Sequence, residues 1–270
     1  MTLENLALLS RRSRLSVALV ILALIGAAAW TAAHFLQPAP RHIVMASGLE
    51  DGLFHQYAKR YVEILARSGV TVEERMTAGA GDNLRLLEDP RSGVDIGFTQ
   101  GGIAKFPEAN DVVMLSNLYY LPMWIFYRDT DTFNQVNELR NHRVAVGAEG
   151  SGTRSLVEPV FALNNLTTEN MTMLPLGNDA ALRALKSDEV DAAVFVDGAQ
   201  NQAVWAALHD PHLRLMSYGH AEAYPRLLPY IKKLTLPSGV IDVAHDIPEK
   251  EVALVGTKAM LAARDGCTPR

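Results

Sequence analysis

The chain has 270 residues, of which 49% are apolar and 20% are charged, and its formal net charge is −5. This composition is typical of a globular protein of one or two domains, and it excludes collagen-like, coiled-coil and wholly disordered chains. An acidic balance is unfavourable for a nucleic-acid-binding protein, which needs a basic face. The single cysteine, Cys267, excludes a disulfide framework and a cysteine-ligated zinc site.

The N-terminal region predicts a membrane segment. Residues 15–36 contain no charged side chain, and about 20 helical residues cross the ~30 Å hydrocarbon core of a bilayer. Three arginines within residues 1–14 predict a cytoplasmic N-terminus, so the chain crosses the inner membrane and its body lies in the periplasm. The alternative is a cleaved signal peptide, because residues 27–29 are alanines that suit a signal peptidase. Residues 37–40 form a proline-containing linker.

Beyond the linker, short apolar runs alternate with segments of helical periodicity, which indicates a mostly parallel sheet covered by helices. Strands are predicted at residues 41–46, 70–76, 94–99, 112–116, 123–127, 143–147, 171–176 and 190–196, and residues 213–217 and 233–235 are expected to carry the chain back to the first lobe. Helices are predicted at residues 53–68, 83–88, 153–164 and 178–186.

Two stretches of sequence occupy equivalent places in this pattern. VDIGFTQGG at residues 94–102 and VDAAVFVDG at residues 190–198 each follow a predicted helix and end in a loop with glycine. The chain therefore predicts two α/β lobes of similar topology. Lobe 1 comprises residues 41–122 and 218–270, and lobe 2 comprises residues 123–217.

The turn Ser151-Gly152-Thr153 is the sharpest candidate site, because it joins a predicted strand to a predicted helix. Unpaired amides and the dipole at a helix N-terminus favour an anion, and the Ser151 and Thr153 hydroxyls offer further hydrogen bonds. The alternative is that one of these hydroxyls only caps the helix. Residues 47–52 and 77–83 are two more strand-to-helix loops of small residues, and such loops gather where open α/β sheets bind ligands.

Three side chains near these loops are candidate ligand contacts. Gln100 follows a buried strand, and its carboxamide both donates and accepts hydrogen bonds. Tyr119 and Tyr120 precede Pro122 and are candidates to line a cleft between the lobes, although packing within the core explains them equally well.

Other chemistries lack their motifs. The turn at residues 147–152 matches neither the Walker loop nor the dinucleotide fingerprint. His209 and His212 are separated by Pro211, which breaks the helix that would align two metal ligands. No nucleophile elbow is present. We therefore expect neither a cofactor, nor a metal, nor a catalytic residue.

From about residue 40 to 265 the chain resembles the TAXI family, the solute receptors of tripartite ATP-independent periplasmic (TRAP) transporters, and within it a membrane-anchored subgroup. The carrying residues are Ser47-Gly48, Gly52-Leu53-Phe54, Thr77-Ala78-Gly79, Asn83-Leu84, residues 94–100, Tyr119-Tyr120, residues 146–153 and Val190-Asp191-Ala192.

The resemblance implies a type II periplasmic binding protein fold that clamps a solute, commonly acidic or amino-acid-like, between two α/β lobes. Its pocket loops fall on Ser47, Gly48, Phe54, Thr77, Gly79, Asn83, Gln100, Ser151, Gly152 and Thr153. Asp51, Phe54 and Ala80 depart from the family pattern, and the extra carboxylate is unfavourable for a dianion. The resemblance also implies a late strand at residues 252–263. The chain then ends where relatives continue into another helix, so we expect reduced stability.

These observations predict an extracytoplasmic solute-binding protein that captures a small, carboxylate-bearing solute by hinge closure and delivers it to TRAP permease subunits. The predicted ligand contacts are the family's pocket residues together with Tyr120. One alternative is a membrane-tethered sensor or accessory protein that feeds no permease. An enzyme on the same fold is the other alternative, and it would need a nucleophile with a base, or paired carboxylates, in the cleft.

Overall fold

The structure is a computed structural model that describes residues 11–35, 41–103, 111–128 and 133–265, with the side chains of residues 15–31 in the first segment. The chain divides into two units. The helix α2 (Arg11–Phe35) belongs to one, and Arg41–Asp265, called the body below, forms the other. The side chains of residues 1–14, the linker at 37–40 and the C-terminal residues 266–270, with Cys267, lie outside the described part of the chain.

Helix α2 covers most of the segment that the sequence predicts as a membrane anchor. Its described side chains are almost all exposed. Among the residues that the structure describes, no helix has the length and apolarity to cross a membrane. The anchor predicted at residues 15–36 is therefore not supported, and the cellular location stays a prediction.

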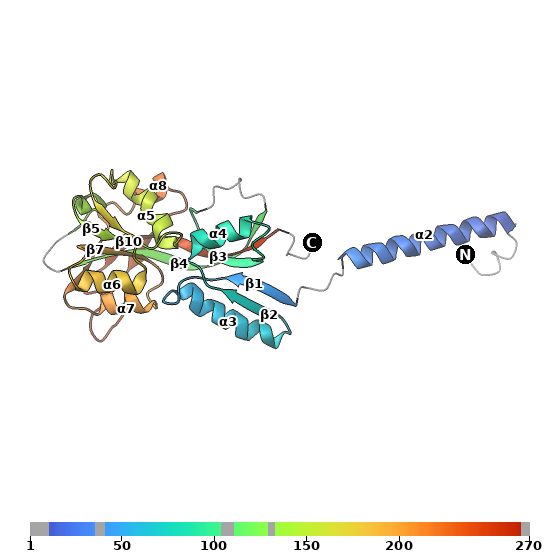
Figure 1. Ribbon diagram of the computed structural model, residues 1–270, viewed down its shortest axis with the longest axis horizontal. Helices are drawn as coiled ribbons and strands as arrows, with labels where there is room; N and C mark the ends of the chain where they lie inside the picture. The colour runs from blue at the N-terminus through green and yellow to red at the C-terminus, as the bar shows by residue number, and fades with distance from the viewer. Residues whose placement is uncertain (1–10, 36–40, 104–110, 129–132, 266–270) are drawn as a thin grey trace. The chain divides into compact units, whose positions relative to one another are not determined.

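The body is built on one ten-stranded sheet whose main path runs β2-β1-β3-β10-β4-β7-β5-β6, with β8 paired to β4 and β9 paired to β10 (Figure 1). The strands are β1 (His42–Ala46), β2 (Thr71–Arg75), β3 (Ile96–Gln100), β4 (Val112–Arg128), β5 (Arg143–Ala145), β6 (Thr172–Leu174), β7 (Ala192–Val196), β8 (Leu213–Leu215), β9 (Lys232–Leu236) and β10 (Val252–Arg264).

The two ends of the sheet share one topology. In the first half, β1 pairs in parallel with β2 and β3. In the second half, β5 pairs in parallel with β6 and β7. Each half is thus a strand–helix–strand–helix–strand unit with its first strand in the middle, as the two equivalent sequence stretches predict. The lobe boundaries stay a prediction, because the body forms a single compact unit.

Two long antiparallel strands join the halves. β10 pairs with β3 of the first half and with β4, and β4 continues into the second half to pair with β7. The prediction of two separate strands at residues 112–116 and 123–127 was wrong. The gap between them contains Pro122, and a proline lacks the amide donor that a strand uses. In the structure, Pro122 lies opposite Gly256, where an added Cβ would come within 2.9 Å of the proline Cα.

Helices cover both faces of the sheet: α4, α5 and α8 lie on one side and α3, α6 and α7 on the other (Figure 1). Their bounds are α3 (Leu53–Arg67), α4 (Ala80–Glu88), α5 (Gly152–Leu163), α6 (Asn178–Lys186), α7 (Gln202–Leu208) and α8 (Tyr224–Leu227), with a short 3-10 helix at Val136–Leu139. Helix α4 begins three residues before the predicted helix because Gly79, at a φ of 131°, starts it. The sequence analysis did not predict α7.

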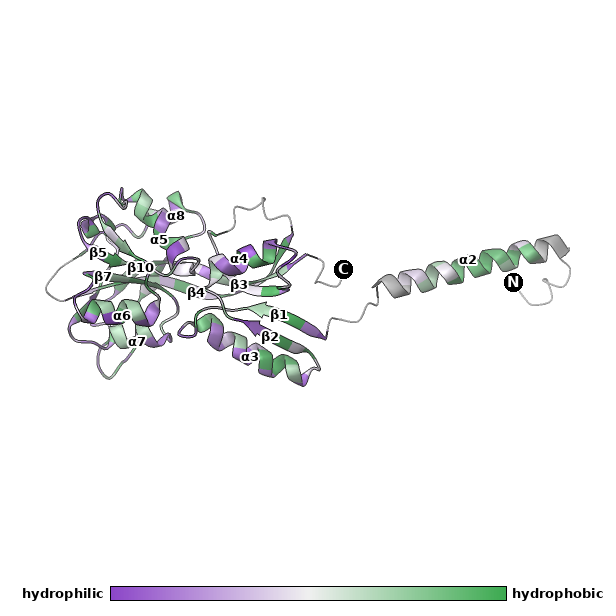
Figure 2. Cartoon of the chain, in the orientation of Figure 1, coloured by the Kyte–Doolittle hydropathy of each residue, from purple (hydrophilic) through white to green (hydrophobic). Residues whose placement is uncertain are grey.

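The hydrophobic core lies on both faces of the sheet, because successive side chains of a strand point to opposite faces. Met45 and Ala46 are both buried, and they enter different hydrophobic clusters because neighbouring strand residues point to opposite faces. The largest cluster surrounds β4, β5 and β7, where Trp124, Phe126 and Phe195 are almost completely buried. Figure 2 shows the hydrophobic residues along these central strands.

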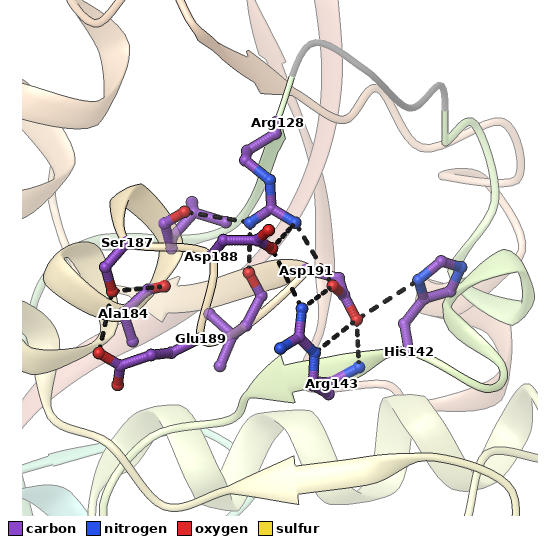
Figure 3. Close-up of polar contacts among 10 residues, drawn as sticks. Arg128, His142, Arg143, Ala184, Ser187, Asp188, Glu189 and Asp191 are labelled. Atoms are coloured by element: carbon purple, nitrogen blue, oxygen red, sulfur yellow. Dashed lines mark hydrogen bonds and ion pairs between the residues drawn. The ribbon is translucent and has the colours of Figure 1, made fainter.

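An aspartate binds the neighbouring strand in each half. In the first half, the Val44 amide donates to Asp95 Oδ2 at 2.8 Å. In the second half, the Arg143 amide donates to Asp191 Oδ2 at 2.7 Å, and the Arg143 guanidinium donates to Asp191 Oδ1 at 2.6 Å. Figure 3 shows Asp191 between Arg143 and His142, with Arg128 bridging to Asp188. In both halves, the aspartate of the repeated Val-Asp thus holds two neighbouring strands together by hydrogen bonds.

Candidate functional site

The two halves of the body meet at a cavity of about 50 Å³. It is lined by the loops that follow β1, β2, β5 and β7, by the last residues of β3 and β7, by the first turns of four helices and by one residue of β4. These residues are Gly48, Leu49, Gly52, Leu53, Phe54, Ala78, Gly79, Ala80, Gln100, Leu121, Ser151, Gly152, Thr153, Asn178, Val196 and Asp197. These loops meet here because the carboxyl ends of the parallel strands in each half face the other half. We call this space the inter-half cavity.

Four helices begin at the inter-half cavity. The first residues of α3, α4, α5 and α6 all line it. The first turn of a helix leaves backbone N–H groups without intrahelical acceptors, and the helix dipole makes this end positive. The cavity therefore offers backbone donors in a positive field, an environment that suits a carboxylate or another anion.

Seven of the residues predicted from the sequence line the inter-half cavity. They are Gly48, Phe54, Gly79, Gln100, Ser151, Gly152 and Thr153. The two hydroxyls of the predicted turn already have partners: Ser151 Oγ accepts from the Arg154 amide and Thr153 Oγ1 accepts from the Val196 amide, both at 3.1 Å. The helix-capping alternative is thus the one found for Ser151, and the turn faces the cavity through its backbone.

Three predicted residues stand behind the cavity wall. Asn83 Nδ2 donates to the carbonyls of Ser47 and Phe98, and the Thr77 hydroxyl donates to Asn83 Oδ1. Ser47 and Asn83 are completely buried. The side chains of Thr77 and Asn83 and the main-chain carbonyl of Ser47 thus hold the loops of the first half together, whereas Ser47 Oγ is buried with no hydrogen-bond partner among the described residues. Contact of these three residues with a ligand stays a prediction.

Tyr120 does not line the inter-half cavity. Its neighbour Leu121 faces that cavity, and adjacent residues of a strand point to opposite sides. Tyr120 lines a separate cavity instead, together with Tyr119. The sequence analysis placed both tyrosines at a cleft, but it could not tell which face of the strand they occupy.

Hydrogen bonds connect the halves across the inter-half cavity. Gln100 Nε2 donates to the Gly152 carbonyl at 2.8 Å, and the Asp82 amide donates to the Gly150 carbonyl at 3.0 Å. Glycine is required at these contacts. A Cβ on Gly152 would collide with the Gln100 carboxamide, and a Cβ on Gly81 would lie 2.8 Å from the Gly150 carbonyl oxygen. The halves are therefore described here in a closed arrangement.

Asp197 is the residue that sequence reasoning missed. It follows β7, is 7% exposed and lines the inter-half cavity. Its Oδ2 accepts from the Leu53 amide of the other half at 3.3 Å and from Asn201 Nδ2 at 2.9 Å, and its Oδ1 accepts from the Gly198 amide. Burial raises the pKa of Asp197 to about 7 against the opposing effect of these hydrogen bonds.

Asp51 makes the reciprocal contact. From the first half, its Oδ2 accepts from the Asp179 amide in the first turn of α6 at 2.9 Å, and its main-chain carbonyl accepts from Asn201 Nδ2 at 2.7 Å. Its other oxygen, Oδ1, is buried and has no hydrogen-bond partner in the described part of the chain. Each half thus places a carboxylate on a helix N-terminus of the other. The signal in the sequence was an aspartate in two of the loops that follow strands.

The charges at the site limit its chemistry. Among the described residues that line the inter-half cavity there is no histidine, lysine or arginine. Within the described ranges, no group of three or more His, Cys, Asp and Glu side chains could hold a metal ion. An anionic ligand would therefore be bound by backbone amides, and Asp197 is the one acidic side chain among the described lining residues.

The sequence profile of the NMT1-like family matches residues 55–269, which is most of the chain. The chain belongs to the NMT1-like family. This family assignment is broader than the TAXI resemblance, so membership of that subgroup stays a proposal. No curated protein matches the sequence significantly.

Solved structures resemble this NMT1-like protein in fold. The protein Tv2483 bound to L-arginine has a TM-score of 0.53 at 12% identity, over 84% of this chain and 79% of its own. The effector binding domain of QuiR in complex with shikimate has a TM-score of 0.52 at 8% identity, over 85% of this chain and 89% of its own. The predicted α/β fold of the periplasmic-binding-protein kind is thus confirmed.

The periplasmic aliphatic sulphonate binding protein SsuA of Escherichia coli has a TM-score of 0.49 at 15% identity, over 83% of this chain. The chain spans 62% of the length of that protein.

Proposed function

We propose that the protein binds a small polar solute between the two halves of its body and closes around it. The observation that carries this proposal is the convergence of four strand-to-helix loops and four helix N-termini on one inter-half cavity. In open α/β sheets, ligands bind beyond the carboxyl ends of the strands. The closed arrangement leaves only about 50 Å³, so a solute enters when the halves separate.

Closure shifts an equilibrium between open and closed forms, because the ligand contacts both halves only in the closed one. β4 and β10 cross between the halves and are the natural hinge. The Gln100–Gly152 and Asp82–Gly150 hydrogen bonds form on closing and add to the stability of the closed form.

In its finer form, the proposal is an extracytoplasmic receptor of the TAXI type that delivers a carboxylate-bearing solute to TRAP permease subunits, with no catalytic step. The motifs at residues 47–54, 94–100 and 146–153 support it, as does the positive field of the helix N-termini. Location in the periplasm, attachment to the inner membrane and the permease partner belong to this proposal.

Isothermal titration calorimetry of the full chain against amino acids, dicarboxylates and sulphonates tests solute binding. We expect one class to bind, and we expect Gly152→Ala to lose that binding because its Cβ displaces the Gln100 carboxamide. Gly26→Ala is the matched control, since a Cβ there contacts nothing. Binding that is unchanged in Gly152→Ala would place the solute elsewhere.

The second candidate is a sensor or accessory protein that binds a solute without feeding a permease. The fold similarity to the QuiR effector binding domain favours this possibility. A gene for a membrane permease beside this one would support the transport receptor, whereas a neighbouring histidine-kinase gene would support the sensor.

A further inference from the structure

A second cavity of about 280 Å³ lies beside β4 and has an aromatic lining. Its walls come from α3, β4, the loop after β7 and the end of β9: Tyr57, Tyr119, Tyr120, Pro122, Trp124, Gly198, Ala199, Gln200 and Leu236. No residue of this lining also lines the inter-half cavity. We call it the aromatic cavity.

A β-bulge brings two adjacent tyrosines to the aromatic cavity. In the pairing of β4 with β10, Asn117 lies opposite Met260 and Tyr120 lies opposite Lys258. Two residues of β4 therefore oppose one residue of β10, and such a bulge re-aims a side chain. As a result Tyr119 joins Tyr120 on one side of the strand, and its ring packs 5.2 Å from the ring of Tyr57.

Tyr119, one of the residues that line the aromatic cavity, carries an unused hydrogen-bond donor. The Tyr119 hydroxyl is buried and has no partner among the described residues. Burial, and next the nearby charge of Asp197, raise the pKa of Tyr119, so the phenol keeps its proton. An unpaired buried hydroxyl is costly, and an acceptor atom in the cavity would relieve that cost.

Two cations flank the aromatic rings. Arg60 Cζ lies 6.0 Å from the centre of the Tyr57 ring, and Lys258 Nζ lies 5.7 Å from the centre of the Tyr120 ring. Within the described part of the chain, neither forms an ion pair with a carboxylate. Each cation therefore lies next to a ring that lines the cavity, although neither cation is itself part of the lining.

We propose that the aromatic cavity is a second binding site, which takes a small aromatic carboxylate. The ring of the ligand packs against the tyrosines, a ligand oxygen accepts from the Tyr119 hydroxyl, and the carboxylate faces Lys258 and Arg60. Aromatic pairs contribute through offset or edge-to-face contact. Its lining residues are separate from those of the inter-half cavity, and both halves contribute to each of the two cavities.

Benzoate is the probe, with benzamide and acetate as comparisons, in calorimetric titrations of the full chain at low salt. We expect benzoate to bind at least tenfold more tightly than either, because benzamide lacks the charge and acetate lacks the ring. Benzamide binding as tightly as benzoate would overturn the assignment to a carboxylate, and no detectable benzoate binding would overturn the site.

Variants locate the site. Tyr119→Phe removes one hydrogen bond and keeps the ring, so benzoate binding should weaken about three- to tenfold. Lys258→Gln should weaken it about two- to fivefold, with the effect decreasing as salt is added. Tyr61→Phe and Lys59→Gln are the matched controls, because they remove the same groups from α3 outside the lining.

The inter-half cavity provides the last control. Val196→Ala changes the lining of the inter-half cavity and not that of the aromatic cavity, so it should leave benzoate binding unchanged. If Val196→Ala weakens benzoate binding while Tyr119→Phe does not change it, the probe occupies the inter-half cavity and the proposed aromatic site is wrong.

Discussion

Asp197 brings two opposing physical effects together in one side chain. Burial favours the neutral carboxyl, whereas the Leu53 and Gly198 amides and Asn201 Nδ2 favour the carboxylate. Burial dominates and raises the pKa to about 7, and the charge of Asp51 adds to this. Because the Leu53 amide belongs to the other half, the protonation of one residue is coupled to the contact between the halves.

A change at Asp197 should alter how stability depends on pH. The raised pKa means that the native state favours the neutral carboxyl of Asp197. The neutral carboxyl therefore contributes fully to the stability of the fold below about pH 4, and this contribution is lost as pH rises towards 7. Asp197→Asn cannot ionise, so its melting temperature should fall less over this range. Scanning calorimetry from pH 4 to 8 measures the difference, with the exposed Asp246→Asn as control. Identical pH profiles for wild type and Asp197→Asn would contradict this prediction.

At the scale of the element, the ends of strands and helices carry the specific interactions. Asp191 joins the first residue of β5 to the start of β7 and to Arg128 at the end of β4 (Figure 3). Burial alone would raise its pKa, but hydrogen bonds and charge from Arg143 lower the pKa to about 2. At the opposite end of β5, Ser151 caps α5 and presents its first turn to the inter-half cavity.

Asp191→Asn should reduce stability at neutral pH and remove an acid-sensitive step. A lowered pKa contributes stability above the ordinary value near 4, and that contribution is lost as pH falls towards 2. After allowance for solvent screening, we expect a loss of about 1 kcal/mol at pH 7. Urea unfolding at pH 7 and pH 3 tests this, and an equal loss at both values would be inconsistent with it.

Ser151→Ala should destabilise α5 by about 1 kcal/mol, the usual value of a helix N-cap. The Arg154 amide loses its acceptor, while the backbone of Gly152 and Thr153 keeps its place at the cavity. We therefore expect a lower unfolding midpoint in urea and little change in solute affinity. Ser155→Ala is a matched control, since its hydroxyl only donates to the Ser151 carbonyl. A large loss of affinity in Ser151→Ala would show that the hydroxyl contacts the solute.

At the scale of the whole body, two units of one topology face each other across the inter-half cavity, and β4 and β10 connect them. The halves contribute reciprocal contacts, with Asp197 on the amide of Leu53 and Asp51 on the amide of Asp179. Because these bonds are lost when the halves separate, they favour the closed form before any solute binds. A solute must therefore contribute more than the contacts it displaces.

Gly81→Ala should shift this balance towards the open form. Its Cβ would lie 2.8 Å from the Gly150 carbonyl oxygen, where neither backbone segment yields easily. We expect small-angle X-ray scattering to give a larger radius of gyration for Gly81→Ala than for wild type, with Gly26→Ala unchanged. Equal radii for all three proteins would mean that this contact does not control closure.

The local hydrophobic pattern of the sequence predicts much of the fold and part of the candidate site. Period-2 and period-3.6 hydrophobicity identified most strands and four of the helices, and the repeated Val-Asp predicted the two equivalent units. The gap predicted between residues 112–116 and 123–127 is part of one strand in the structure, where Pro122 fits opposite Gly256, a partner far along the chain. Helix α7 was missed because it is short and is fixed by the Asn201 cap. Ligand contact by Tyr120 stays a prediction, because the face of the sheet that a strand residue occupies depends on partners that the sequence does not specify.

The sequence by itself determined the class of fold, the two related units and the loops from which a site would be built, because these follow from local periodicity and from glycine at strand ends. Only the tertiary structure decided which atoms face the inter-half cavity. It assigned the Ser151 and Thr153 hydroxyls to the protein's own amides, buried Asp197 beside the other half and turned Tyr119 and Tyr120 to a second cavity. The physical reason is that side-chain partners, burial and bulges arise from contacts between residues far apart in the chain.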